Sequence, residues 1–249
     1  MNVNKSCSIP EWKSGSRSEA AGLRAWKQRM LLAERLDTLE ILDRTAPDAE
    51  TLRRTYWELN ELHRWLGNQA AVLRRLREAG VGRESRVLDL GCGQGALLRE
   101  VNAQLGCSVV GVDLRGGCAE AQVEIVRADA VTDPLPEADV AVCVVMAHHL
   151  DPARLQAMIA NVARSCETLV LLDLIRHPLP LALFRTFVAP LLSHINAADG
   201  ETSIRRAYTA REMRAIVEKA VNDCGRPVRE VRHNVAWLWL RQVVTVRWG

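Results

Sequence analysis

Residues 86–95 read Arg-Val-Leu-Asp-Leu-Gly-Cys-Gly-Gln-Gly. The apolar first half predicts a buried strand, and glycines at 91, 93 and 95 then interrupt it. A helical run follows over residues 96–105 and stops at Gly106. A strand, a glycine turn and a helix N-terminus together bring backbone N–H groups close to a ligand. The stretch therefore predicts a ligand-binding turn.

Asp113 indicates what kind of ligand this turn binds. It closes the apolar run Val-Val-Gly-Val-Asp, which predicts a second strand, and it lies 20 residues beyond Gly93. At this spacing a carboxylate can accept hydrogen bonds from ribose hydroxyls. We expect a nucleoside-containing cofactor.

Asp89 separates two possible cofactors. The pattern Gly91-x-Gly93-x-x-Ala96 also fits the dinucleotide fingerprint. A carboxylate at the strand end repels a pyrophosphate, however, and attracts a cationic ligand such as S-adenosylmethionine. Asp89 therefore favours the cationic cofactor.

The run Asp89–Gly95 resembles the first motif of class I S-adenosylmethionine-dependent methyltransferases. That resemblance implies an α/β, Rossmann-like, doubly wound sheet, mostly parallel with an antiparallel last strand. It also implies S-adenosylmethionine as the cofactor, with S-adenosylhomocysteine as the product. The cofactor-binding residues that it implies are Asp89, Gly91, Cys92, Gly93, Gly95, Asp113, Leu114, Asp129, Ala130 and Met146.

Two histidines follow the predicted fourth strand, in Val145-Met-Ala-His-His-Leu150. The carboxyl end of such a strand borders the ligand crevice, and a histidine there can act as a general base. We expect this role for His149 rather than His148, with methyl transfer to oxygen. The alternative is a histidine that packs beside the cofactor with its ring hydrogen-bonded to backbone.

Substrate contacts are expected after the fifth strand, where the sequence resembles a bacterial subgroup of small-molecule methyltransferases. The apolar stretch 179–192 predicts a lid that offers Leu183, Phe184, Phe187 and Leu191 to a hydrophobic or aromatic metabolite. A buried helix or a dimer contact is the alternative. The other expected substrate residues are Asp173, Arg176, His194, Arg205 and Tyr208. Asp173 could instead form a structural ion pair with Arg176 or Arg205.

The order of segments predicts a loose tail over residues 1–22, a helical cap over 23–80 and the methyltransferase domain over 81–249, with the lid-like insertion at about 176–208. Within the cap, Leu32, Leu36 and Leu39 share one helical face. Residues 45–48 (Thr-Ala-Pro-Asp) resemble a capping box, and Asn68 is expected to cap a third helix.

Composition limits the other classes of function. The 249 residues carry a net charge of +3 without a basic block, so no nucleic-acid partner is expected. Seven cysteines without a Cys-x-x-Cys pair favour a reduced, cytoplasmic protein without a zinc site. No carboxylate-rich cluster predicts a metal, and no segment predicts a membrane span. A homodimer, a non-catalytic accessory subunit that binds the cofactor, and a protein or RNA methyltransferase remain alternatives.

Overall fold

A computed structural model describes residues 32, 34–45, 47–116, 123–236 and 240–249. The predicted tail over residues 1–22 and the first part of the predicted cap, residues 23–31, lie outside the described residues. The fold below is that of residues 35–249, which form one compact unit.

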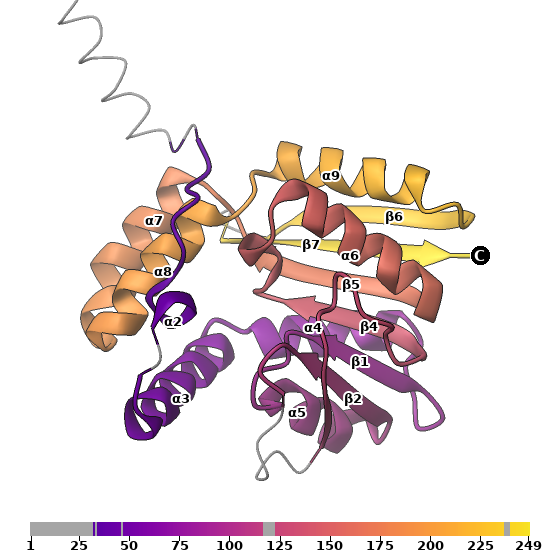
Figure 1. Ribbon diagram of the computed structural model, residues 1–249, viewed down its shortest axis with the longest axis horizontal. Coiled ribbons are helices and arrows are strands. Elements are labelled where there is room, and N and C mark those ends of the chain that lie inside the picture. The colour runs from indigo at the N-terminus through magenta and orange to yellow at the C-terminus, as the bar shows by residue number, and fades with distance from the viewer. Residues whose placement is uncertain (1–31, 33, 46, 117–122, 237–239) are drawn as a thin grey trace, which may run out of the picture. The chain divides into compact units, whose positions relative to one another are not determined.

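A seven-stranded sheet lies at the centre of this unit (Figure 1). Its order is β3-β2-β1-β4-β5-β7-β6, and β7 runs antiparallel to both of its neighbours while the first five strands are parallel. The strands are β1 (Arg86–Leu90), β2 (Ser108–Asp113), β3 (Glu124–Arg127), β4 (Ala138–Val144), β5 (Cys166–Leu174), β6 (Val228–Val235) and β7 (Arg241–Trp248). The predicted fold class, including the antiparallel last strand, is confirmed.

Helices cover both faces of the sheet, so the strands are buried on both sides. On one face, α6 (Pro152–Ser165) and α9 (Ala210–Asp223) pack into a core with Leu88 and Leu90. On the other face, α4 (Asn68–Glu78) and α5 (Ala96–Leu105) pack into a second core. Alternating strand residues supply the two cores, as the pleat of a strand requires.

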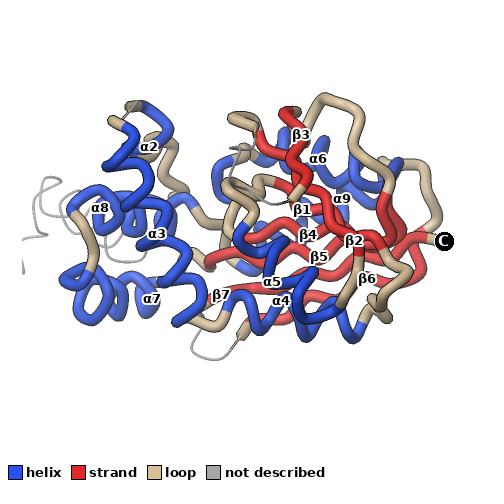
Figure 2. The backbone as a smooth tube through the Cα atoms, turned by 90° about the horizontal axis from the view of Figure 1, so that it is seen from below, coloured by secondary structure: helices blue, strands red, loops and turns tan. Residues whose placement is uncertain are grey.

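A group of helices lies beyond one end of the sheet, separate from the two covering layers (Figure 2). Its central helix, α8, contacts α2, α3 and α7. The members are α2 (Ile41–Arg44), α3 (Ala49–Trp65), α7 (Pro178–Leu183), η2 (Phe184–Val188), η3 (Ala189–Leu191) and α8 (His194–Arg206). Thus a segment from before β1 and a segment from between β5 and β6 meet at this end.

Two helices begin at residues whose side chains cap them. The Asp151 side chain accepts a hydrogen bond from the backbone of Arg154 at the start of α6. Thr209 and Glu212 form a capping box at the start of α9. Both caps satisfy N–H groups that the first turn of a helix leaves unpaired.

Three local predictions in the cap are wrong. Residues 35–40 have no regular secondary structure, so Leu36 and Leu39 do not share a helical face. Asp48 caps α3 through the N–H groups of Glu50 and Thr51, whereas Thr45 follows α2. The N-cap of α4 is Gly67, at φ 71°, and Asn68 is the first helical residue. The Asn68 side chain instead accepts a hydrogen bond from Arg241 (2.7 Å), a contact that local sequence does not reveal.

The helices of the predicted cap contact two different parts of the fold. Leu76 of α4 is buried in the core of the sheet, whereas α3 packs against α8. The predicted boundary between residues 80 and 81 remains a prediction. Among the described residues, no helix is long and apolar enough to cross a membrane.

Candidate active site

The glycine turn between β1 and α5 has the conformation that its residues require. Gly91 and Gly95 have φ angles of 71° and 72°, a region that glycine adopts without strain. A Cβ atom at position 91 would lie 2.7 Å from Cγ of Met146. The backbone of the turn is therefore accessible to a ligand, with no side chain between them.

Asp113 ends β2 directly beside this turn. Its Oδ2 atom accepts a hydrogen bond from the N–H of Gly93 (2.9 Å), and its Oδ1 atom accepts one from the N–H of Arg115 (2.9 Å). Since β1 and β2 are parallel neighbours, both carboxyl ends meet at the same edge of the sheet. The predicted pairing of the motif with Asp113 is thus present in the fold.

Asp89 lies behind the turn and is almost completely buried. Burial, together with the nearby Asp113 carboxylate, raises the pKa of Asp89 to about 8. A cation in front of the turn would favour the ionised form of Asp89. The carboxylate therefore favours a positively charged ligand.

A cavity of about 400 Å³ opens in front of the motif. The predicted cofactor residues that line it are Gly91, Gly93, Asp113, Leu114, Asp129, Ala130 and Met146. Asp129 is held by Arg154 at 2.9 Å and by the backbone of Val131. Three other predicted cofactor residues are not among the described residues that line the cavity: Asp89, Cys92 and Gly95. The Cys92 side chain instead packs against β2, because a Cβ on Gly111 would lie 2.4 Å from its Sγ atom.

Val145 has a strained backbone in the same wall. Its φ angle is 52°, which is unusual for a β-branched residue. Its N–H donates to the carbonyl oxygen of Leu172 (2.8 Å), which continues the β4–β5 pairing by one residue. Such strain is typical of positions that hold a functional loop in place. Here it turns the chain so that Met146 faces Gly91.

The opposite wall of the cavity comes mainly from segments of the predicted cap. It consists of Glu40, Leu42, Asp43, Tyr56 and Leu59, together with His149 and Leu150. The two acidic residues of this wall were not predicted from the sequence. No local pattern marks them, because their partners lie more than 100 residues further along the chain.

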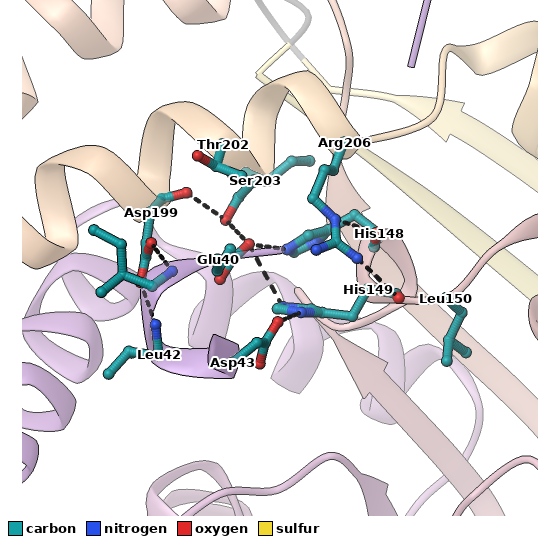
Figure 3. A network of polar contacts seen from close by, with 12 residues as sticks. Glu40, Leu42, Asp43, His148, His149, Leu150, Asp199, Thr202, Ser203 and Arg206 are labelled. Carbon is teal, nitrogen blue, oxygen red and sulfur yellow. Dashed lines mark hydrogen bonds and ion pairs between the residues drawn. The ribbon is translucent and has the colours of Figure 1, made fainter. Parts of the chain in front are cut away.

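His148 and His149 lie side by side behind and within this wall (Figure 3). Nδ1 of His148 lies 2.8 Å from Oδ1 of Asp173, and Nδ1 of His149 lies 3.0 Å from Oδ2 of Asp43. Both Nε2 atoms face Oε1 of Glu40, at 3.5 Å from His148 and 3.8 Å from His149. The Ser203 hydroxyl donates to the same Glu40 oxygen (2.5 Å).

The two histidines have different environments. His148 is buried. Burial opposes a charge on its ring, but Asp173 and Glu40 outweigh that effect and raise the pKa of His148 to about 9. Burial likewise opposes ionisation of Glu40, yet His148 holds the pKa of Glu40 below its ordinary value. His149 is partly exposed and is the histidine that lines the cavity.

The predicted substrate residues lie elsewhere. The Phe184 ring fills the space where a Cβ on Gly200 would lie, at 2.3 Å, and Phe187 and Leu191 are exposed. In the described part of the chain, none of these residues lines the cavity, nor does Leu183. The structure therefore does not support the predicted lid over the cofactor. The segment packs on α8 instead.

The polar members of the predicted substrate set have structural partners. Arg176 pairs with Glu212, and Arg205 lies 3.0 Å from Glu201. The Tyr208 hydroxyl donates to the carbonyl oxygen of Leu150 (2.6 Å). His194 is an exposed residue at the start of α8. Asp173, for which an arginine partner was considered, contacts His148 instead.

Comparison with known proteins agrees with the motif. Residues 87–168 match the family model described as "Methyltransferase domain". This part of the chain is therefore similar to a methyltransferase domain. This domain contains the glycine turn, Asp113, Asp129 and both histidines.

Solved structures share this fold at low sequence identity. The plantazolicin methyltransferase BpumL, in complex with SAH, superposes with a TM-score of 0.60 at 11% identity, over 80% of this chain and 91% of that one. Human N-acetylserotonin methyltransferase, in complex with SAM, superposes with a TM-score of 0.54 at 18% identity, over 79% of this chain. The matched part spans 56% of the human protein.

A third similar structure is magnesium protoporphyrin IX methyltransferase from Synechocystis PCC 6803, with bound SAH. Its TM-score is 0.50 at 17% identity, over 92% of this chain and 94% of that one. No curated protein matches the sequence itself. At these identities, the likeness establishes the fold, and the acceptor has to be inferred from this chain's own residues.

Proposed function

We propose that the chain transfers a methyl group from S-adenosylmethionine to an oxygen atom of a small, partly apolar metabolite. The supporting observation is a single arrangement: the glycine turn and Asp113 form one wall of a cavity, and Glu40, Asp43 and His149 form part of another. One wall suits a cationic nucleoside. The other wall carries polar groups that can hold an acceptor.

The cofactor's methionine part would lie against Gly91 and Gly93, where no side chain blocks the backbone. Its ribose hydroxyls would donate to Asp113, which has lone pairs left beside its two backbone hydrogen bonds. The adenine would lie near Leu114 and Ala130. Asp89 would stabilise the positive charge of the ligand from behind the turn.

The acceptor would occupy the side of the cavity lined by Leu42, Tyr56 and Leu59. An apolar surface with a few polar groups is typical of small-molecule sites. Methyl transfer requires the acceptor oxygen to be aligned with the methyl carbon and to lose its proton. His149 is the histidine at this wall, and Asp43 fixes the orientation of its ring. His148 is unsuited to accept the proton because its raised pKa keeps it charged.

A labelled-methyl assay tests this function. Purified protein is incubated with S-adenosylmethionine carrying a labelled methyl group and with an extract of the source cells, and the extract is then fractionated. We expect label in an organic-soluble, low-molecular-weight product. Label in protein or RNA would favour a macromolecular acceptor, and tight cofactor binding without any transfer would favour the accessory-subunit alternative. Asp113→Ala serves as the matched control with impaired cofactor binding.

A further inference from the structure

Three ligand atoms from distant parts of the chain converge beside the cavity (Figure 3). They are Nε2 of His148, Nε2 of His149 and Oε1 of Glu40, and all lie within 4.8 Å of one another. Glu40 comes from the segment before α2, whereas the histidines come from the turn after β4. These types of atoms, at such mutual distances, are able to hold a metal ion.

Each imidazole is oriented toward this point by a carboxylate on its other nitrogen. Asp173 holds Nδ1 of His148, and Asp43 holds Nδ1 of His149. A histidine that donates Nδ1–H to a carboxylate directs Nε2 to the opposite side. A metal ion would replace the proton on Nε2 of His148, so binding would release that proton. Metal-binding histidines commonly have this second partner, which fixes the ring and strengthens the donor.

His148 supplies an independent sign of a missing ligand. Its Nε2 atom is buried and has no hydrogen-bond partner among the described residues. Its side chain is only 1% exposed, and Glu40 at 3.5 Å is not placed for a hydrogen bond. A buried polar atom without a partner is costly. A cation between Nε2 and Glu40 would remove this cost.

We propose that Glu40, His148 and His149 bind a divalent transition-metal ion such as Zn²⁺. Two imidazoles and one carboxylate are a donor set that suits Zn²⁺, whereas Mg²⁺ and Ca²⁺ prefer oxygen ligands alone. Ligand atoms around one Zn²⁺ lie about 3.3 Å apart. The distances from Oε1 of Glu40 to the two Nε2 atoms, 3.5 and 3.8 Å, are close to that spacing. Three protein ligands leave one position open, as in catalytic zinc sites.

The open position would face the acceptor, because Glu40 and His149 line the cavity. This role of the ion rests on the proposed function. The ion would bind the acceptor hydroxyl and lower its pKa, so that the proton leaves to solvent. The oxygen then attacks the methyl carbon, the carbon–sulfur bond breaks, and its electron pair stays on sulfur. His149 would act as a ligand rather than a base, since both roles use the Nε2 lone pair.

Zn²⁺ titration of the tag-free full chain, after dialysis against a chelator, tests the site by calorimetry. We expect saturable binding of one ion, with little competition from Mg²⁺. His149→Ala removes a ligand, and Asp43→Asn removes the partner that orients it; each should weaken Zn²⁺ binding by more than about tenfold. His194→Ala changes an exposed histidine away from the cluster and should leave binding unchanged.

The same samples are titrated with S-adenosylhomocysteine, and their circular dichroism spectra confirm folding. Co²⁺ bound in place of Zn²⁺ gives visible absorption bands that should change in Asp43→Asn. Absence of one-to-one Zn²⁺ binding, or equal affinity in wild type, His149→Ala and Asp43→Asn, would overturn the cation site. Binding of S-adenosylhomocysteine without binding of Zn²⁺ would overturn the metal site and leave the proposed function intact. Binding of Zn²⁺ without binding of S-adenosylhomocysteine would support the metal site and contradict the proposed function.

Discussion

The carboxylate of Asp113 accepts a hydrogen bond from the backbone N–H of Gly93 over 2.9 Å, although the two residues are 20 positions apart in sequence. This contact ties the end of β2 to the glycine turn. In the proposed function, this carboxylate accepts hydrogen bonds from the ribose hydroxyls of the cofactor.

Asp113→Ala should therefore weaken the binding of S-adenosylmethionine at least tenfold, or about 1.4 kcal/mol, because hydrogen bonds to a charged acceptor are lost. Equilibrium dialysis with labelled cofactor measures the change. Asp223→Ala, which removes an exposed ion pair with Lys219 on α9, should leave affinity unchanged. Equal affinities in all three proteins would contradict the assigned role of Asp113.

Gly91→Ala should abolish cofactor binding at concentrations that saturate the wild type. The new Cβ would lie 2.7 Å from Cγ of Met146, and the φ angle of 71° is strained for alanine. Gly82→Ala is the matched control, because a Cβ there has nothing within 4 Å. Thermal melts of both variants separate loss of the site from loss of the fold. Normal cofactor binding by Gly91→Ala would show that the turn is not the binding surface.

Val145→Gly should change the free energy of unfolding by less than about 1 kcal/mol. Relief of the positive φ angle, a strain of about 1–3 kcal/mol, offsets the loss of the side chain. Val144→Gly, one residue earlier in β4, has no such strain to relieve and should cost about 2–4 kcal/mol. Urea unfolding compares the two variants. Similar costs at both positions would mean that Val145 is not strained in solution.

Glu58 should make the protein sensitive to acid. Burial opposes its ionisation, but hydrogen bonds from Ser193, Asn196 and Arg54 outweigh that effect and lower the pKa of Glu58 to about 2. A lowered pKa contributes stability that is complete above the ordinary value of 4.5 and is lost as pH falls toward 2. Since Ser193 and Asn196 lie at the start of α8, this carboxylate joins α3 to α8.

Glu58→Gln should lower stability at pH 7 and flatten the decline between about pH 4.5 and 2. Denaturant midpoints across that range measure both effects. The exposed Glu50→Gln on the same helix should follow the wild-type profile. A Glu58→Gln profile that parallels the wild type would exclude a structural role for the charge.

The sheet was predictable because its signals are local. Each apolar run, glycine turn and capping residue, such as Asp151 and Thr209, acts within a few positions of itself. The proximity of the glycine turn and Asp113 was predictable for the same reason, since both follow strands at fixed spacing. Parallel neighbours then bring them together at one edge of the sheet.

The second wall was not predictable, because distant contacts form it. Arg35 donates to the carbonyl oxygens of His148 and Leu150, and Asp199 accepts from the N–H of Ile41 and of Leu42. These bonds hold residues 35–40 in an irregular conformation where periodicity favoured a helix. They also bring Glu40 and Asp43 to the histidines, a meeting that no local pattern encodes.

The packing partner of the apolar segment after β5 could not be predicted from composition. Its hydrophobicity predicted a lid, and part of it is indeed buried. Phe184, however, packs against Gly200 of α8, a partner that lies outside the segment and has no side chain to reveal it. Composition showed that the segment needs an apolar partner, and the fold decided which partner it has.

The most direct test of this account is a calorimetric titration of the wild-type chain with S-adenosylhomocysteine and, separately, with NAD. The glycine turn and Asp113 fit both ligands by pattern, and the buried Asp89 favours the first. We predict one-to-one binding of S-adenosylhomocysteine and no measurable heat with NAD. Binding of NAD without binding of S-adenosylhomocysteine would contradict the proposed function.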